Sequence, residues 1–217
     1  MFSKSKNVGT CFICHQTINN ILIARHLNDC IKKEIEAHPK ETKTTEIFRI
    51  KISSNKTFWL YVEMPAHASL QYLDDFLRAI WLECCGHLSE FKIRGAIRFH
   101  INQAINQFLK KGTQFSYEYD FGSTTLLEGE VIDCYKGHIN KKVRFLARNN
   151  MPTIKCTTCS SNPKSICSYC YKFCCMQCFK KHKCGKEGML PVVNSPRMGV
   201  CGYTGERESA KSLREWA

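Results

Sequence analysis

The chain has 217 residues, of which 43% are hydrophobic and 24% are charged, the composition of an ordinary globular protein. It contains no run of about 18 uncharged apolar residues, so we expect no membrane span and no membrane partner. The polar and basic segment 1–10 lacks the apolar core of a secretory signal, so we expect a cytoplasmic protein.

Fifteen cysteines are many for that compartment, where thiols stay reduced and dense cysteines indicate metal more often than disulfides. The net charge of +13 is uneven, because residues 138–217 carry 15 basic and 4 acidic groups. Thiolates that bind metal ions would lower this net charge, so some of the lysines would then only balance thiolate charge.

The first cysteine cluster lies in residues 1–35, ahead of an amphipathic stretch from Asn19 to Ile35. Two cysteines three positions apart form a tight knuckle, and a histidine and a cysteine four positions apart share one face of a helix. Together they supply the four ligands of a closed tetrahedral zinc site. The predicted ligands are Cys11, Cys14, His26 and Cys30. The alternative is a reduced cysteine pair beside a helical histidine.

A polar linker over 36–46 leads to a middle domain, residues 47–147, with enough aromatic residues to bury one core. Alternating apolar residues predict half-buried strands that form a hairpin around Asn55-Lys56. Ser69 is expected to cap a helix that reaches Trp81. The further elements that we predict are strands at 91–93, 115–119, 125–135 and 143–147, and a second helix over 101–112.

The second cluster, within a module of residues 148–190, contains eight potential ligands in four pairs. Pairs at this density usually interleave, which predicts a cross-brace of two zinc sites. One site would use Cys156, Cys159, Cys175 and Cys178, and the other Cys167, Cys170, His182 and Cys184. Cys174 competes with Cys175, and the spacing does not choose between them. One zinc with spare thiols is the alternative. Full sets of four ligands are typical of structural rather than catalytic zinc.

Three resemblances accompany these patterns. The first cluster resembles the small Rad-eighteen-type fingers, and the second resembles B-box and HIT-type cross-brace fingers; both resemblances imply zinc. The middle domain resembles the Ri-plasmid ORF-three-like family, also called insertion-element passenger proteins. That resemblance covers residues 45–147 and rests on the segments Phe58-Trp-Leu-Tyr-Val-Glu-Met64, Leu73 to Phe91, and Tyr117-Glu-Tyr-Asp-Phe-Gly122. It implies an α+β, β-grasp-like domain of a family associated with mobile elements.

Two functions follow as hypotheses. The first is a non-enzymatic zinc-binding interaction protein of about three zinc ions, whose basic C-terminal module engages nucleic acid or a protein. Its candidate nucleic-acid contacts are Lys172, Lys180, Lys181, Lys183 and Lys186, interleaved with tyrosines and phenylalanines. The alternative is that the lysines form a solvated basic face, while the aromatic residues form the core of the module.

The second hypothesis is an enzyme with a thiol or metal-assisted site near Cys85, His87 and Asp120. The alternative is that His87 and Asp120 only fix turns, beside small apolar cysteines. In the irregular tail, residues 191–217, the motif from Asn194 to Tyr203 could dock on the middle domain or contact a partner. Cys201 within it is also a possible spare metal ligand.

Overall fold

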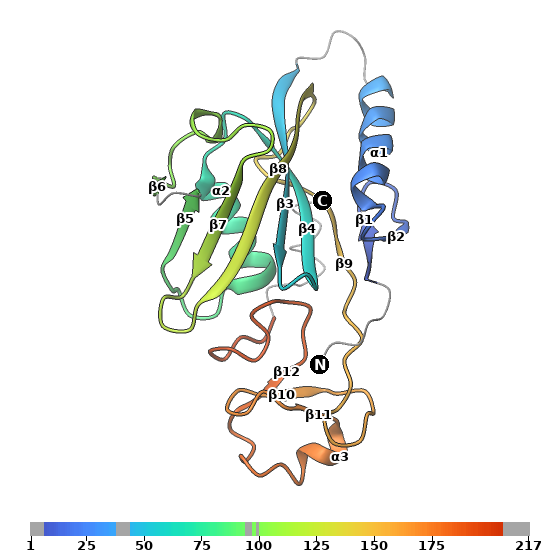
Figure 1. Cartoon of the computed structure of the whole chain (residues 1–217), viewed down its shortest axis with the longest axis vertical. Helices are drawn as coiled ribbons and strands as arrows, with labels where there is room; N and C mark the ends of the chain where they lie inside the picture. Colours follow the sequence, from blue (N-terminus) through green and yellow to red (C-terminus); the bar gives the residue numbers. More distant parts are fainter. Residues whose placement is uncertain (1–6, 38–43, 94–96, 99, 206–217) are drawn as a thin grey trace.

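The computed structural model describes residues 7–37, 44–93, 97–98 and 100–205 (Figure 1). Residues 38–43 of the predicted linker and 206–217 of the predicted tail lie outside these ranges. The described chain forms a large antiparallel sheet with a few helices, and a smaller cysteine-rich module lies at one end (Figure 1). The α+β class is thereby confirmed, whereas the β-grasp arrangement stays a prediction.

The large sheet contains nine strands in the order β2-β1-β9-β4-β3-β8-β7-β5-β6, and each neighbouring pair is antiparallel. The strands are β1 (Val8–Cys11), β2 (Thr17–Asn19), β3 (Thr45–Ser54), β4 (Phe58–Pro65), β5 (Ser89–Ile93), β6 (Ile97–Arg98), β7 (Gln114–Tyr119), β8 (Thr125–Gly137) and β9 (Arg144–Asn149). The first finger therefore contributes two strands to the same sheet as the middle domain, because β1 pairs with β9.

The predicted hairpin is confirmed, with Ser54 opposite Phe58 across the turn. Asn55 and Lys56 both adopt positive φ, 52° and 56°, which matches the twist that tight hairpin turns need. The predicted strands at 91–93, 115–119, 125–135 and 143–147 correspond to β5, β7, β8 and β9.

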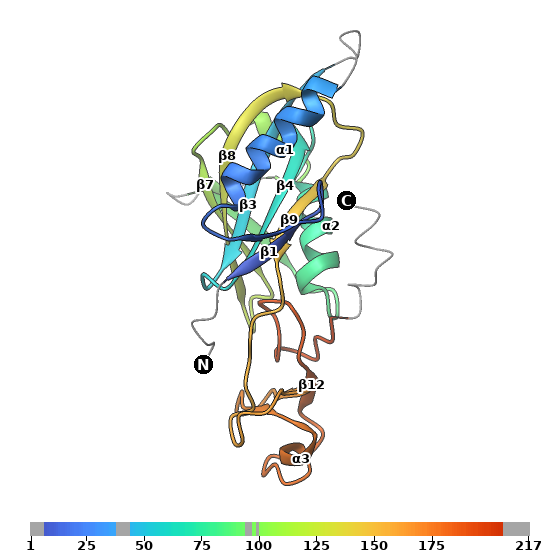
Figure 2. The ribbon, with the colours of Figure 1, turned by 90° about the vertical axis from the view of Figure 1, so that its right-hand side faces the viewer.

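Strand β4 is buried on both faces, although its alternation predicts burial on one. Phe58, Leu60 and Val62 face the main core, where α2 (Leu70–Leu77) and a π-helical turn (Arg78–Leu82) pack. Trp59 and Tyr61 face the opposite side and contact the buried face of α1 (Ile23–Ala37). Figure 2 shows α1 crossing the strands on that side. No helix in the described ranges is long and apolar enough to cross a membrane.

The predicted helix over 101–112 is wrong. This segment contains only a short 3₁₀ turn, Ile105–Gln107. The backbone N–H groups of Ile105 and Asn106 donate to the carbonyls of Ala68 and Ala66. Its apolar residues still reach the core, but its hydrogen bonds go to the connection before α2, so no α-helix can form.

The C-terminal module contains a three-stranded sheet, ordered β11-β10-β12, and one helical turn. Its elements are β10 (Ser165–Cys167), β11 (Phe173–Cys174), α3 (Met176–Phe179) and β12 (Met189–Pro191). Where the chain leaves and re-enters the core, Asn149 Nδ2 donates to Asn194 Oδ1, and Asn194 Nδ2 donates to the carbonyl of Asn149. The module is therefore held to the core at both of its ends.

Candidate metal centres

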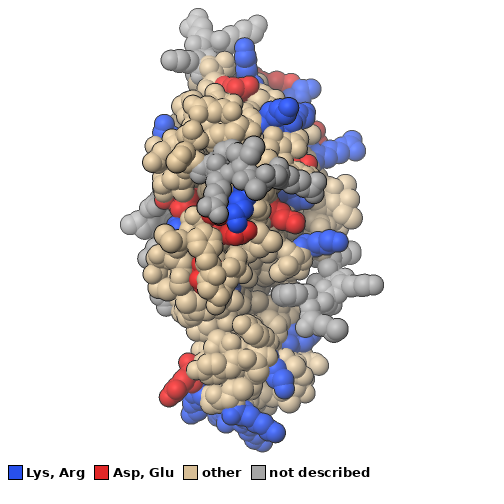
Figure 3. Space-filling model, turned by 60° about the vertical axis from the view of Figure 1, so that its left-hand side comes forward, with Lys and Arg blue, Asp and Glu red and all other residues tan. Residues whose placement is uncertain are grey.

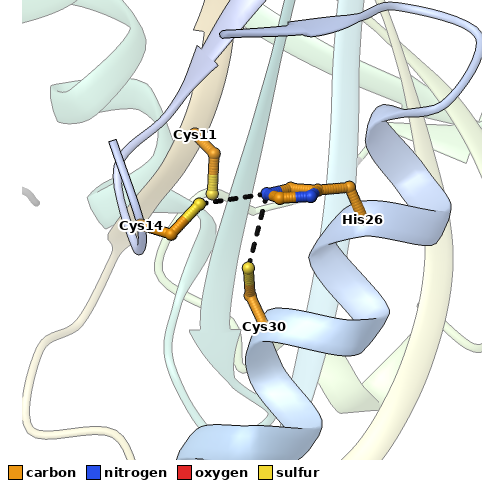
Figure 4. A group of neighbouring side chains, drawn as sticks. All are labelled: Cys11, Cys14, His26 and Cys30. Atoms are coloured by element: carbon orange, nitrogen blue, oxygen red, sulfur yellow. Dashed lines mark hydrogen bonds between the residues drawn. The ribbon is translucent and has the colours of Figure 1, made fainter. Parts of the chain in front are cut away.

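The first predicted cluster is assembled from a strand, a turn and a helix (Figure 4). His26 Nε2 lies 3.1 Å from Cys14 Sγ and 3.4 Å from Cys30 Sγ. The ligand atoms of all four residues, with Cys11 the fourth, lie within 4.8 Å of one another and could hold a metal ion.

Strand β1 and helix α1 together position this group. Cys11 is the last residue of β1 and is fully buried. His26 and Cys30 lie one turn apart on α1, whose Ile23, Leu27 and Ile31 pack beneath them against the sheet. Burial of three such side chains contributes roughly 1.5–3 kcal/mol each, so the sheet positions the helix that carries half of the ligands.

The second cluster divides into two groups, and the grouping is the interleaved one. Cys156, Cys159, Cys175 and Cys178 form one group, and Cys167, Cys170, His182 and Cys184 form the other. Within the first, Cys159 Sγ lies 3.5 Å from Cys175 Sγ and 3.6 Å from Cys178 Sγ. Within the second, Cys170 Sγ lies 3.5 Å from His182 Nε2.

The structure distinguishes Cys175 from Cys174. The Cys175 thiol belongs to the first group, whereas Cys174 belongs to neither. Cys174 Sγ instead lies 3.7 Å from His182 Nδ1, the ring nitrogen that points away from the second group. Cys174 can therefore help to orient His182 without contributing a ligand atom.

Backbone N–H groups stabilise the thiolate form of Cys156 and of Cys167 in two of the knuckles. Burial alone would raise the pKa of Cys156, but N–H groups that include that of Cys175 lower it to about 6. Burial would likewise raise the pKa of Cys167, and N–H groups that include that of Cys170 lower it to about 6. Since metal binds thiolate and not thiol, both loops already favour the form that binds metal.

The structure brings together a fourth group that local spacing does not predict. Its members come from the loop after the π-helical turn and from the tail: Cys84, Cys85, His87 and Cys201. More than 110 residues separate Cys201 from the other three. The available signals were the unassigned cysteines left after three sites and the paired glycines around Cys201.

The residues of the proposed thiol site do lie together, but not as a catalytic relay. His87 Nε2 is 3.0 Å from Cys85 Sγ and 3.4 Å from Asp120 Oδ2, so both groups face the same ring nitrogen. In a nucleophile–base–carboxylate arrangement the carboxylate orients the other nitrogen. Asp120 also has other partners, because Arg197 donates to its Oδ2 at 2.6 Å. That hydrogen bond is the main reason why the pKa of Asp120 falls to about 2.

Asp120 also fixes a turn, as the structural alternative predicts. Its Oδ1 accepts hydrogen bonds from the backbone N–H groups of Gly122 and Ser123, and its own φ is +66°. A short polar side chain suits this left-handed position because it can bond to the backbone nearby.

All five predicted nucleic-acid contacts, the lysines at 172, 180, 181, 183 and 186, are exposed on the C-terminal module. Figure 3 shows Lys and Arg side chains gathered at the tip of the molecule where this module lies. Two basic residues that precede the second cysteine cluster have structural partners instead. Arg144 binds Glu34 and Glu63, and Arg148 donates to the carbonyl of Asn194.

Comparisons with known proteins add little. No protein-family model matches the chain, and no curated protein matches it. A crystal structure of a protein of unknown function from Methanosarcina mazei Go1 matches 57% of this chain and 71% of its own, with 12% identity and a TM-score of 0.39. A match with so low a TM-score and sequence identity defines neither the fold nor the function of this chain. The resemblance to the Ri-plasmid ORF-three-like family therefore stays a prediction.

Proposed function

We propose that the chain is a zinc-binding interaction protein whose three predicted centres scaffold a binding surface on the C-terminal module. The proposal rests on the observation that the ligand atoms of each predicted set lie within 4.8 Å of one another. A set of four thiolates, or of three thiolates and one imidazole, suits zinc, whereas carboxylate and carbonyl oxygens suit magnesium or calcium.

The separations within the groups support a tetrahedral ion. Zn–S bonds of about 2.3 Å place two tetrahedral sulfurs about 3.8 Å apart and a sulfur and an imidazole nitrogen about 3.5 Å apart. The sulfur pairs at Cys159 lie at 3.5 and 3.6 Å. The sulfur–nitrogen pairs at His26 and His182 lie between 3.1 and 3.5 Å.

Each set supplies four ligands, which leaves no open position for a substrate or a water molecule. The zinc then serves folding. The module has few buried apolar side chains besides Ile166 and its cysteines, so metal binding would supply most of its folding free energy.

We propose nucleic acid as the partner. Phe173 and Phe179 are half-buried and fit the module's core, whereas Tyr169 and Tyr171 are 65% and 60% exposed and stay available to a partner. Exposed lysines lie on the same module, and Glu187 is the single acidic residue between 156 and 190. Exposed rings can stack on unpaired bases while ammonium groups contact phosphates, which favours a single strand.

The zinc part is tested by metal analysis of the purified chain. We expect at least three zinc ions per chain, and a value near zero would refute the proposal. Replacing Cys14 with Ser should remove one ion.

The partner part is tested by fluorescence anisotropy with mixed-sequence single-stranded oligonucleotides. If all five lysines contact phosphates, log K should fall with log salt at a slope of about −3.5, so affinity should drop roughly 100-fold between 50 and 200 mM salt. Tyr169→Ala should weaken binding by about 1–3 kcal/mol through lost stacking.

The matched control is Lys32→Gln, because Lys32 is also exposed but lies on α1, away from the module. It should leave affinity unchanged, whereas Lys180→Gln with Lys181→Gln should reduce both the affinity and the salt slope. Binding that is absent, or that ignores both lysines and Tyr169, would sink the nucleic-acid assignment and favour a protein partner.

A further inference from the structure

We propose that Cys84, Cys85, His87 and Cys201 form a fourth zinc centre, which fastens the tail to the core. Around one point, Cys85 Sγ lies 3.7 Å from Cys84 Sγ and 3.9 Å from Cys201 Sγ. His87 Nε2 lies 3.0 Å from Cys85 Sγ and 3.2 Å from Cys201 Sγ. These separations match those of the three predicted groups.

The separations also fit the metal. A tetrahedral zinc requires about 3.8 Å between sulfurs and about 3.5 Å between sulfur and nitrogen. Both sulfur pairs agree within about 0.1 Å. The sulfur–nitrogen pairs are shorter by about 0.3–0.5 Å, compared with about 0.1–0.4 Å at His26 in the first centre. The residue set, three thiols and one imidazole, is that of the first centre.

The loop that carries three of the ligands is held by its own contacts. Gly86 adopts φ of +81°, and its N–H donates to Glu83 Oε1 at 2.6 Å. Glu83 in turn accepts from Arg78, and the His87 ring packs edge-on against Tyr119. The ligands on this loop are thus oriented by contacts that do not involve the tail, as expected of a metal site with supporting contacts.

The tail presents Cys201 at a conformational cost. Its φ is +47°, a left-handed conformation that a residue with a Cβ rarely adopts. Gly199 and Gly202 beside it also have positive φ, 84° and 67°. Such a conformation persists where surrounding interactions compensate for it, and a bond from Cys201 to a shared metal would do so.

The charge around the group also suits a thiolate–zinc centre. Three thiolates and one zinc leave a net charge of −1, and Arg197 places a guanidinium nitrogen 3.5 Å from Cys84 Sγ. Arg197 is fully buried and comes from the same tail as Cys201. Its ion pair with Asp120 and the metal at Cys201 would hold the tail at two neighbouring points.

Metal counting tests the centre directly. We expect four zinc ions in the wild-type chain, three in Cys201→Ser and three in His87→Ala. Cys134→Ser is the matched control, because Cys134 is a partly exposed thiol that belongs to no group, and it should retain four. A wild-type count of three, unchanged by Cys201→Ser, would overturn the fourth centre and leave the three-zinc proposal standing.

Thiol alkylation of the wild-type chain provides a second test that needs no variant. Zinc should protect Cys201 and Cys85, both exposed, and removal of the metal by a chelator should make both reactive. Reaction of Cys201 in the zinc-loaded chain as fast as in the chelated chain would contradict the proposal. So would a disulfide between Cys85 and Cys201 in protein purified under reducing conditions.

Limited trypsin digestion measures how firmly the tail is held to the core. The bond after Arg197 is protected because Arg197 is fully buried. Cys201→Ser should accelerate cleavage at this bond severalfold, while Cys134→Ser should not. Equal cleavage of the two variants would mean that Arg197 and its neighbours hold the tail without metal.

Discussion

Cys174 and Cys175 are adjacent in the sequence and both buried, yet they have different surroundings. Cys175 points into a group of four thiols, and Cys174 lies against a carbonyl and the far side of His182. A pattern of pairs cannot separate two neighbours that each fit the spacing. The direction of each side chain separates them, because successive residues around an extended backbone point to opposite sides.

This difference predicts unequal effects of matched substitutions. Cys175→Ala should remove one zinc per chain, because its site would keep only three thiolates. Cys174→Ala, which deletes an equally buried thiol, should keep the full count. Native mass spectrometry of both variants measures this, and loss of a zinc from Cys174→Ala alone would reverse the assignment.

Ligands close together in the chain could be predicted, and distant ones could not. The spacing of a Cys-x-x-Cys knuckle and of a helical His–Cys pair predicts that their side chains lie close together. The group from Cys11 to Cys30 could be predicted for this reason. The fourth group needs the chain to return from Cys201 to Cys85 after crossing the whole module. No local rule encodes that return.

At the scale of elements, α1 and β4 explain why the first finger joins the main sheet. A finger standing alone could not cover Trp59 and Tyr61, which β4 presents to it. The nearly continuous apolar run from Phe58 to Val62 is the sequence signal for a strand covered on both faces. The helix that covers the second face lies in the preceding segment, which sequence alone does not place.

Leu27 is the central contact of α1 with the sheet and is fully buried. Leu27→Ala should lower the free energy of unfolding by about 2–5 kcal/mol through lost burial and the cavity it leaves. Leu22→Ala removes the same atoms from a side chain that is 56% exposed and should change stability by less than about 0.5 kcal/mol. Urea denaturation of the zinc-loaded variants measures both, and equal effects would contradict the docking of α1.

The wrong helix over 101–112 shows what periodicity omits. Ile101, Ile105 and Phe108 recur at helical spacing, and Ile105 is fully buried. Periodicity reports which residues face the core, but not where their backbone groups find partners. Here Ile101 accepts from Gln71 and Ile105 donates to Ala68, so tertiary hydrogen bonds replace helical ones.

At the scale of the whole molecule, the stability of the sheet and that of the module would depend on bound metal to different degrees. The main core packs α2 against β3, β4, β7 and β8 through many fully buried side chains. The module has a short three-stranded sheet and few buried apolar groups outside its cysteines. Stability should therefore be local, with separate responses to loss of metal.

Chelation should reveal this difference. After zinc is removed, amides of β10 and β11 should lose protection against hydrogen exchange, while amides of β3 and β8 keep it. Exchange measured by mass spectrometry tests this, and added zinc should restore the module. Simultaneous loss of protection in both parts would show that the molecule folds as one metal-dependent unit.

The reciprocal bonds between Asn149 and Asn194 have a consequence for how such a chain can diversify. The entire module between these two residues begins and ends at one place on the sheet. Ile154 and Ile166 of the module belong to the main core cluster and must keep their contacts, but its exposed loops can change in length without moving either end. The exposed surface of this part of the chain can thus change without disturbing the fold that supports it.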